Sequence, residues 1–110
     1  MMSVVNLMTA AMPCPVYASK TRDLGERMVY SINTTTYNGA RRNVRMKTYI
    51  FAATMERAIE LQGILDRAIV PLGDCPLTST CTSCERNGGG WLEDGDQYMQ
   101  IAYYDLVLRR

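Results

Sequence analysis

The fold is decided by residues 27–52, which read RMVYSINTTTYNGARRNVRMKTYIFA. This stretch is rich in Val, Ile, Tyr and Thr, the residues that favour β-strands. From Val44 to Ile50 every second side chain is apolar or threonine, which is the period-2 pattern of a strand with one buried face. Asn38-Gly39 divides the stretch and can adopt the positive φ angles of a tight hairpin turn. We therefore predict a long β-hairpin with strands at Arg27–Tyr37 and Arg42–Ala52.

A helix is predicted on each side of this hairpin. In the N-terminal segment Ser3–Met12, apolar residues recur three and four positions apart, as on one face of a helix. After the hairpin, Thr54 is placed to cap a helix from Met55 to Val70, which Pro71 and Gly73 would end. The apolar face predicted for this second helix consists of Met55, Ala58, Ile59, Leu61, Leu65, Ala68 and Ile69.

The last third of the chain divides into a predicted loop and a second predicted hairpin. Residues 74–90 contain three cysteines and the run Gly88-Gly89-Gly90, a composition typical of a long loop. Trp91-Leu92 would then open a short strand, and a turn at Asp94-Gly95 would lead into a long final strand, Gln97–Leu108. This order of elements predicts an α+β fold, an antiparallel sheet with two helices packed on one face. The length suits a single domain spanning residues 1–110.

Composition argues against several classes of function. The chain has 12 basic and 11 acidic residues, a net charge of +1, and no histidine. Without histidine, Ser-His and Cys-His catalytic pairs are excluded, so we predict that the chain is not an enzyme. A nucleic-acid binder usually carries a clear basic excess, and a membrane span needs about 20 apolar residues; neither feature is present. The apolar segment Met1–Met12 lacks the basic start of a secretion signal, so we expect a cytoplasmic chain.

Cys81-Thr-Ser-Cys84 is the only motif with potential redox or metal chemistry. With Cys75 and Cys14 it would supply four thiolates to zinc, but a zinc ribbon shows two closely spaced pairs and this chain has one. We predict ordinary thiols that are not required for folding, and neither a metal nor a cofactor. Cys75, Cys81 and Cys84 are the candidate ligands if zinc is bound, and a disulfide is the other alternative.

Four basic residues, Arg41, Arg42, Arg45 and Lys47, follow the predicted hairpin turn. Such a basic tip can contact an acidic protein surface, nucleic acid or only water. We predict that it is a contact element, because a polar and basic tip gains little by folding back onto its own core.

Several segments together resemble one protein family. These are Pro15-Val16-Tyr17, the strand that begins Arg27-Met-Val-Tyr-Ser-Ile-Asn-Thr-Thr, the strand Val44–Phe51 before a helix beginning Thr54-Met-Glu-Arg-Ala-Ile-Glu, and the final strand Asp96–Leu108. In this order they resemble the tail-completion proteins, or tail terminators, of long-tailed bacteriophages and prophages. The resemblance spans nearly the whole chain, and the segment Cys75–Cys84 departs from the family pattern.

The resemblance implies a structural protein with an α+β fold and no active site. It implies a homo-oligomeric ring, typically a hexamer, at the head-proximal end of the tail tube, where tail-tube and head-connector proteins meet. The protein would be located in the tail or neck of the virion after assembly in the host cytoplasm. The long hairpin and the long final strand would extend a sheet across subunits. Alternatives are a small binding module that uses a zinc loop or the basic hairpin, and a thiol redox enzyme.

Overall fold

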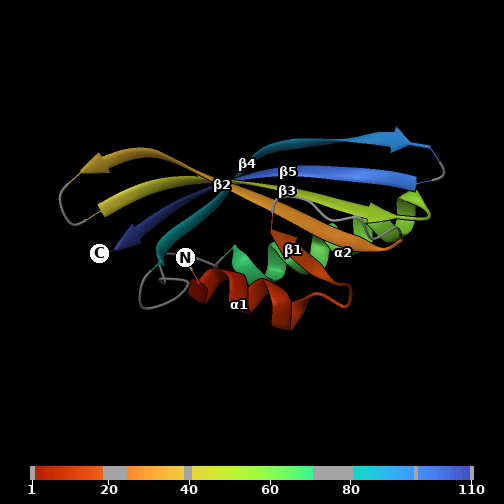
Figure 1. Ribbon diagram of the computed structural model, residues 1–110, viewed down its shortest axis with the longest axis horizontal. Coiled ribbons are helices and arrows are strands. Elements are labelled where there is room, and N and C mark those ends of the chain that lie inside the picture. The colour runs from red at the N-terminus through yellow and green to blue at the C-terminus, as the bar shows by residue number, and fades with distance from the viewer. Residues whose placement is uncertain (1, 19–24, 39–40, 71–80, 96, 110) are drawn as a thin grey trace.

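The structure is a computed structural model that describes residues 2–18, 25–38, 41–70, 81–95 and 97–109. In chain order its elements are α1 (Met2–Ala11), β1 (Val16–Ala18), β2 (Arg27–Asn38), β3 (Arg41–Ala52), α2 (Met55–Ile69), β4 (Cys81–Asp94) and β5 (Gln97–Arg109). The strands form one layer, and both helices lie beneath it on the same side (Figure 1). The predicted α+β architecture, with two helices on one face of a sheet, is therefore confirmed.

The five strands form a single sheet in the order β1-β2-β3-β5-β4. β1 runs parallel to β2, whereas the other three pairs are antiparallel. The sheet is thus mixed, which corrects the prediction of an antiparallel sheet; β1 has only three residues and carries little strand signal. β5 lies between β3 and β4, so the final strand is interior and has no free edge with which to extend a sheet.

The predicted long hairpin is formed by β2 and β3, which have 12 residues each. Their antiparallel pairing runs from Arg27 opposite Phe51 to Asn38 opposite Arg41, with a bulge between Thr34 and Thr36. Gly39 of the predicted turn lies outside the described residues.

The core lies between the sheet and the helices. The predicted alternation on β3 is confirmed, because its even-numbered residues from Val44 to Ala52 are all buried. The side chains that join them from β5 and α1 are Ala102, Tyr104, Leu106, Leu108, Val4 and Met8. Thr48 is polar but buried, and its hydroxyl donates a hydrogen bond to the carbonyl of Ala102 at 3.4 Å.

Polar contacts at the N-terminus of α2 tie this helix to the start of β2. The hydroxyl oxygen of Thr54 accepts a hydrogen bond from the backbone N–H of Arg57 at 3.2 Å, which confirms the predicted cap. The Arg57 guanidinium donates two bonds of 2.9 Å to Glu26, and this contact lowers the pKa of the Glu26 carboxyl. Ile59 was assigned to the apolar face but is exposed, because it lies about 100° around the helix from Ala58.

β4 corrects the prediction of a long loop over residues 74–90. From Cys81 to Asp94 the chain forms a 14-residue strand that pairs with β5, while residues 74–80 lie outside the described part. Two irregularities interrupt the pairing, one between Cys81 and Ser83 and one between Arg86 and Gly89. Few β-branched or aromatic residues mark this strand, so its pairing with β5 overrides a weak local preference.

Candidate interaction surfaces

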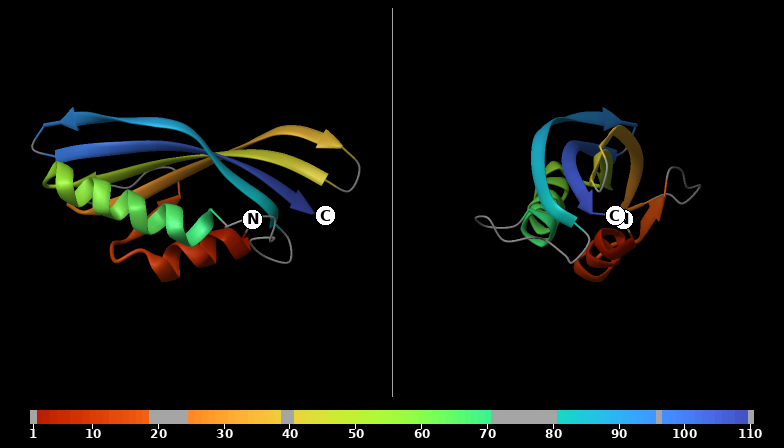
Figure 2. Two further views of the ribbon diagram at one scale, coloured as in Figure 1. Left: turned by 180° about the vertical axis from the view of Figure 1, so that it is seen from behind. Right: turned by 90° about the vertical axis from the view of Figure 1, so that its left-hand side faces the viewer.

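The sheet face opposite the helices is not covered by any described element (Figures 1 and 2). Cross-strand partners project from the same face, so the register assigns its side chains. Apolar side chains of this open face include the half-buried Tyr49, Phe51, Met99, Ile101 and Tyr103, the exposed Leu92 and the buried Val29. A solvated face of an antiparallel sheet is normally polar, whereas contiguous apolar side chains at a surface mark a contact site.

Lys47 lies among the aromatic rings of the open face. Its ammonium nitrogen is 5.1 Å from the ring centroid of Tyr49 and 5.3 Å from that of Tyr103. These are cation–π distances. The contacts hold the lysine and both rings in one arrangement, so this part of the face is preformed.

Arg27 covers another ring of the same face. Its guanidinium lies 3.9 Å from the ring centroid of Phe51 and donates hydrogen bonds to the carbonyl of Gly25 and the side-chain oxygen of Gln97. The side chain is buried, although a charged group of this kind is usually exposed. The Arg27 guanidinium and the Phe51 ring are therefore packed together at this end of the open face.

The four predicted interface residues, Arg41, Arg42, Arg45 and Lys47, do not form one basic tip. Arg45 and Lys47 project from the open face, but Arg42 pairs with buried Leu108 and so belongs to the helix side of the sheet. Arg41 lies at the turn end of β3, opposite Arg109. The predicted patch is divided between two faces, and its role in contacts between copies remains a prediction.

Arg45 is also engaged within the chain. Its Nε atom is 3.1 Å from Oδ1 of Asp105, and the second carboxylate oxygen of Asp105 accepts a 2.7 Å hydrogen bond from Asn87. Arg45 and Asp105 are both half-exposed, so this pair contributes little to stability. It does neutralise part of the positive charge on which the interface prediction depended.

Both edges of the sheet are incompletely covered. β4 forms one edge, and at the other β1 pairs only with Met28–Tyr30, which leaves residues 31–38 of β2 without a described neighbour on the side away from β3. The large hydrophobic side chains exposed in the described part are Ile32 (37%), Ile59 (56%), Trp91 (54%) and Leu92 (53%). Trp91 and Leu92 lie on β4, and Ile32 lies in the part of β2 that β1 does not cover, so exposed apolar surface is concentrated at the two edges.

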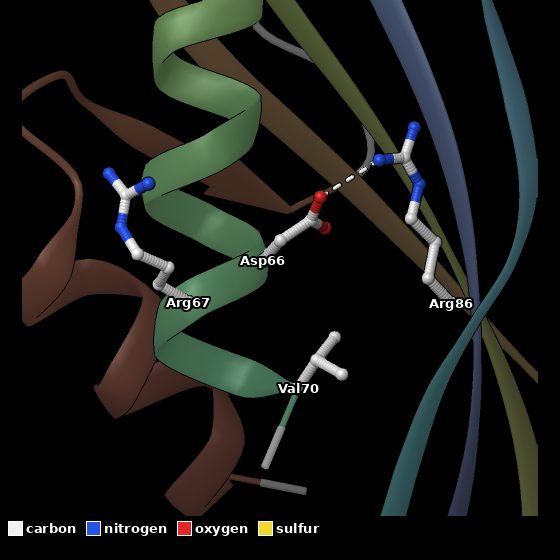
Figure 3. A pocket seen from close by; sticks show the side chains of 4 residues that line it. All are labelled: Asp66, Arg67, Val70 and Arg86. Carbon is white, nitrogen blue, oxygen red and sulfur yellow. Dashed lines mark hydrogen bonds and ion pairs between the residues drawn. The ribbon is translucent and has the colours of Figure 1, made fainter. Parts of the chain in front are cut away.

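A groove of about 530 Å³ lies between α2 and β4, and Asp66, Arg67, Val70 and Arg86 line it. Figure 3 shows Asp66 and Arg86 pointing toward one another, with Arg67 on the other side of the helix. The guanidinium of Arg86 lies 2.8 Å from Oδ2 of Asp66. This ion pair joins α2 to β4.

A buried polar network lies behind that ion pair. The hydroxyl of Tyr104 donates to Oδ1 of Asp66, and the side-chain amide of Gln62 donates to the Tyr104 oxygen at 2.6 Å and to Asp66 at 3.2 Å. Burial raises the pKa of Tyr104, so the phenol stays protonated and serves as a hydrogen-bond donor. The network fixes α2 on the sheet. The four-residue spacing of Gln62 and Asp66 was its only signal in the sequence.

Cys81 and Cys84 lie in the core, which corrects their assignment to a loop. Both are buried, opposite Leu108 and Leu106 of β5, and the Cys81 thiol donates to the carbonyl of Ser83 at 3.2 Å. Burial raises the pKa of both thiols, that of Cys84 to about 12, whereas a reactive or metal-binding cysteine needs a lowered pKa and access. Cys75 lies outside the described residues, within which no group of three or more Cys, Asp or Glu side chains is arranged to hold a metal.

The buried Cys84 thiol predicts a loss of stability at alkaline pH. Its ordinary pKa is 9.0 and its folded pKa is about 12, so the folded state holds the proton more tightly. The associated stability is present below about pH 9 and is lost progressively as the pH rises toward about 12. We expect the urea midpoint, followed by circular dichroism, to fall between about pH 8 and about pH 11, and to fall less in Cys84→Ala. An equal fall in both proteins would contradict this, since Tyr104 is common to them.

Comparisons with known proteins give no match, either to a protein-family model or to a curated protein. Among the described helices, none is long and apolar enough to cross a membrane. A functional proposal therefore rests on the surfaces of the sheet and on the resemblance in the sequence.

Proposed function

We propose that the chain is a structural tail-completion protein of a bacteriophage or prophage. In this role it forms a homo-oligomeric ring, of six copies, at the head-proximal end of the tail tube and mediates head–tail joining. The observation that carries the proposal is the incompletely covered sheet, on whose two edge regions Ile32, Trp91 and Leu92 are exposed. Exposed apolar surface and unpaired strand edges are stabilised when a partner or another copy covers them.

The side chains that could take part in catalysis are engaged in holding the fold together, which favours a role in assembly. Cys81 and Cys84 are packed in the core, and the hydroxyl of Tyr104 donates a hydrogen bond to Asp66. The sequence has no histidine to act as a general base near neutral pH. A protein of this kind would act through its surface, in the tail or neck of a virion assembled in the host cytoplasm.

We expect an equilibrium between monomer and a single closed ring that shifts with protein concentration. Copies joined head to tail bury a different patch on each side, and the rotation between them must close to avoid fibres. Each contact can be of moderate strength, because a ring opens only when two contacts break. Analytical ultracentrifugation over a concentration series should show monomer and one discrete larger species. A continuous series of ever larger species would contradict ring closure.

The open face favours a second candidate function, binding of single-stranded nucleic acid. Tyr49 and Tyr103 flank Lys47 there, and aromatic rings beside cations are the elements on which bases stack. The pairing of Arg45 with Asp105 and the net charge of +1 count against it. Fluorescence anisotropy with a labelled single-stranded oligonucleotide would distinguish the two functions. Salt-dependent binding that is lost in Tyr103→Ala would favour the nucleic-acid module.

A further inference from the structure

We propose that neighbouring copies join edge to edge, with β4 of one copy beside the uncovered half of β2 of the next. The sheet would then continue from copy to copy. The inference rests on the proposed function, because it specifies the contact from which a ring of this chain would be built.

The two edges offer strand segments that can pair. On β2, residues 31–38 lie beyond β1 and have no described neighbour on that side. On β4, the segment from Gly89 to Asp94 lies beyond the bulge and keeps a regular register with β5. At about 3.3 Å per residue, each segment is about 20 Å long or more. Pairing them would satisfy backbone groups that are otherwise left to solvent.

One exposed apolar side chain on each edge, Ile32 and Trp91, projects from the same face of the sheet. Ile32 pairs with buried Met46, so it projects from the helix side of the sheet. Trp91 pairs with Gln100, whose own partner on β3 is buried Ile50, so Trp91 projects from the same side. In a continuous sheet, residues of one face become direct or diagonal neighbours across strands. The contact would therefore bring Trp91 of one copy near Ile32 of the next.

The strand directions suit a head-to-tail arrangement. Within one copy β2 and β4 run in opposite directions, because three successive antiparallel pairings separate them. Copies related by rotation about a ring axis keep the same orientation, so β4 of one would meet β2 of the next in an antiparallel pair. A two-fold contact between two β4 strands would close at a dimer and leave the β2 edge uncovered.

The test uses one charged substitution on each edge and a matched control. Lysine on an edge strand disfavours pairing with another strand. We expect Ile32→Lys and Trp91→Lys each to raise the concentration needed for assembly by about tenfold or more, as expected for a contact that contributes to the interface core. Ile59→Lys places the same charge at an exposed position on α2, away from both edges, and should assemble like wild type. Circular dichroism melts establish that each variant is folded.

Mixing the two edge variants tests whether the contact is heterologous. Each variant keeps one intact edge, so an equimolar mixture should form a two-chain species but no ring. If β4 instead paired with β4, Ile32→Lys would assemble normally and only Trp91→Lys would fail, which would overturn the inference.

Hydrogen exchange on the unmodified chain gives an independent measurement. Amides in residues 31–38 and 89–94 should become protected when the monomer assembles, and unchanged exchange in both segments would overturn the inference. If wild type assembles while both lysine variants assemble equally well, the inference is wrong and the proposed function stands. If wild type neither assembles nor binds tail tubes, the proposed function fails and the edge contact fails with it.

Discussion

Replacing Gly89 with alanine is expected to destabilise the fold severely. Gly89 follows the bulge in β4 with a φ of 157°, a conformation that residues with a side chain rarely adopt. A Cβ atom there would lie 2.4 Å from the carbonyl oxygen of Ile101 and 3.3 Å from Cα of Ala102. Both are backbone atoms of the paired strand, so no change of rotamer relieves the clash. We expect a loss of about 2–4 kcal/mol in the free energy of unfolding.

Gly90→Ala is the matched control for this prediction. The neighbouring position has open space around an added Cβ and no positive φ, so its substitution should change stability by about 0.5 kcal/mol or less. Urea denaturation of the two variants, followed by circular dichroism, measures the difference. Equal stability in the two variants would show that β4 does not approach β5 as closely as the structure has it.

Asp66→Ala should have the second-largest effect. The carboxylate accepts hydrogen bonds from Tyr104, Gln62 and Arg86, and its loss leaves a buried hydroxyl and a buried amide without that acceptor. Leaving buried donors unsatisfied costs about 1–3 kcal/mol per group, so we expect a total loss of about 2–4 kcal/mol. The Oε1 atom of Gln62 already lacks a donor within the described part of the chain, so the network contains one unsatisfied polar atom even before the substitution.

Two further variants sharpen this prediction. Glu60→Ala removes an acid from the same helix, but Glu60 is exposed and bonds to Arg57 at the surface, so about 0.5 kcal/mol or less should be lost. Adding Tyr104→Phe to Asp66→Ala removes the unsatisfied hydroxyl and should recover part of the loss. Thermal or urea unfolding of the wild type and these three variants measures the differences. An Asp66→Ala loss no larger than that of Glu60→Ala would contradict the role of the network.

The sequence predicted the elements whose pattern is local. The hairpin of β2 and β3 follows from the alternation Val44, Met46, Thr48 and Ile50, and α2 follows from its cap at Thr54 and its helical spacing. These signals lie within a single element, so they can be read before any tertiary contact is known. Ile59 shows the limit of such reasoning, since an apolar residue beside a buried face need not belong to it.

The elements that depend on distant partners were not predictable in the same way. β4 contains Cys, Ser, Asn and Gly where a strand usually has β-branched residues, and it becomes a strand through its pairing with β5. The three residues of β1 gave no indication of a parallel pairing with β2. The place of β5 inside the sheet is likewise a property of the topology. The edge that the sequence suggests for the final strand therefore lies on β4.

The candidate surfaces were predicted in part. The alternation on β3 placed Tyr49 and Phe51 on the face away from the core, but it could not show that no helix covers that face. The sequence showed Arg45 and Lys47 as neighbouring basic residues. It could not show the ion pair of Arg45 with Asp105 or the contact of Lys47 with the Tyr103 ring, because both partners lie on β5. The exposed positions at the two sheet edges required the strand order.

The central claim is that this chain acts by forming a ring on the end of a tail tube. Electron microscopy of the purified protein mixed with tail tubes from the phage or prophage that encodes it tests the claim most directly. Our account predicts ring-shaped density that caps one end of each tube and leaves the other end and the wall bare. Tubes that stay bare at both ends under saturating protein would contradict it.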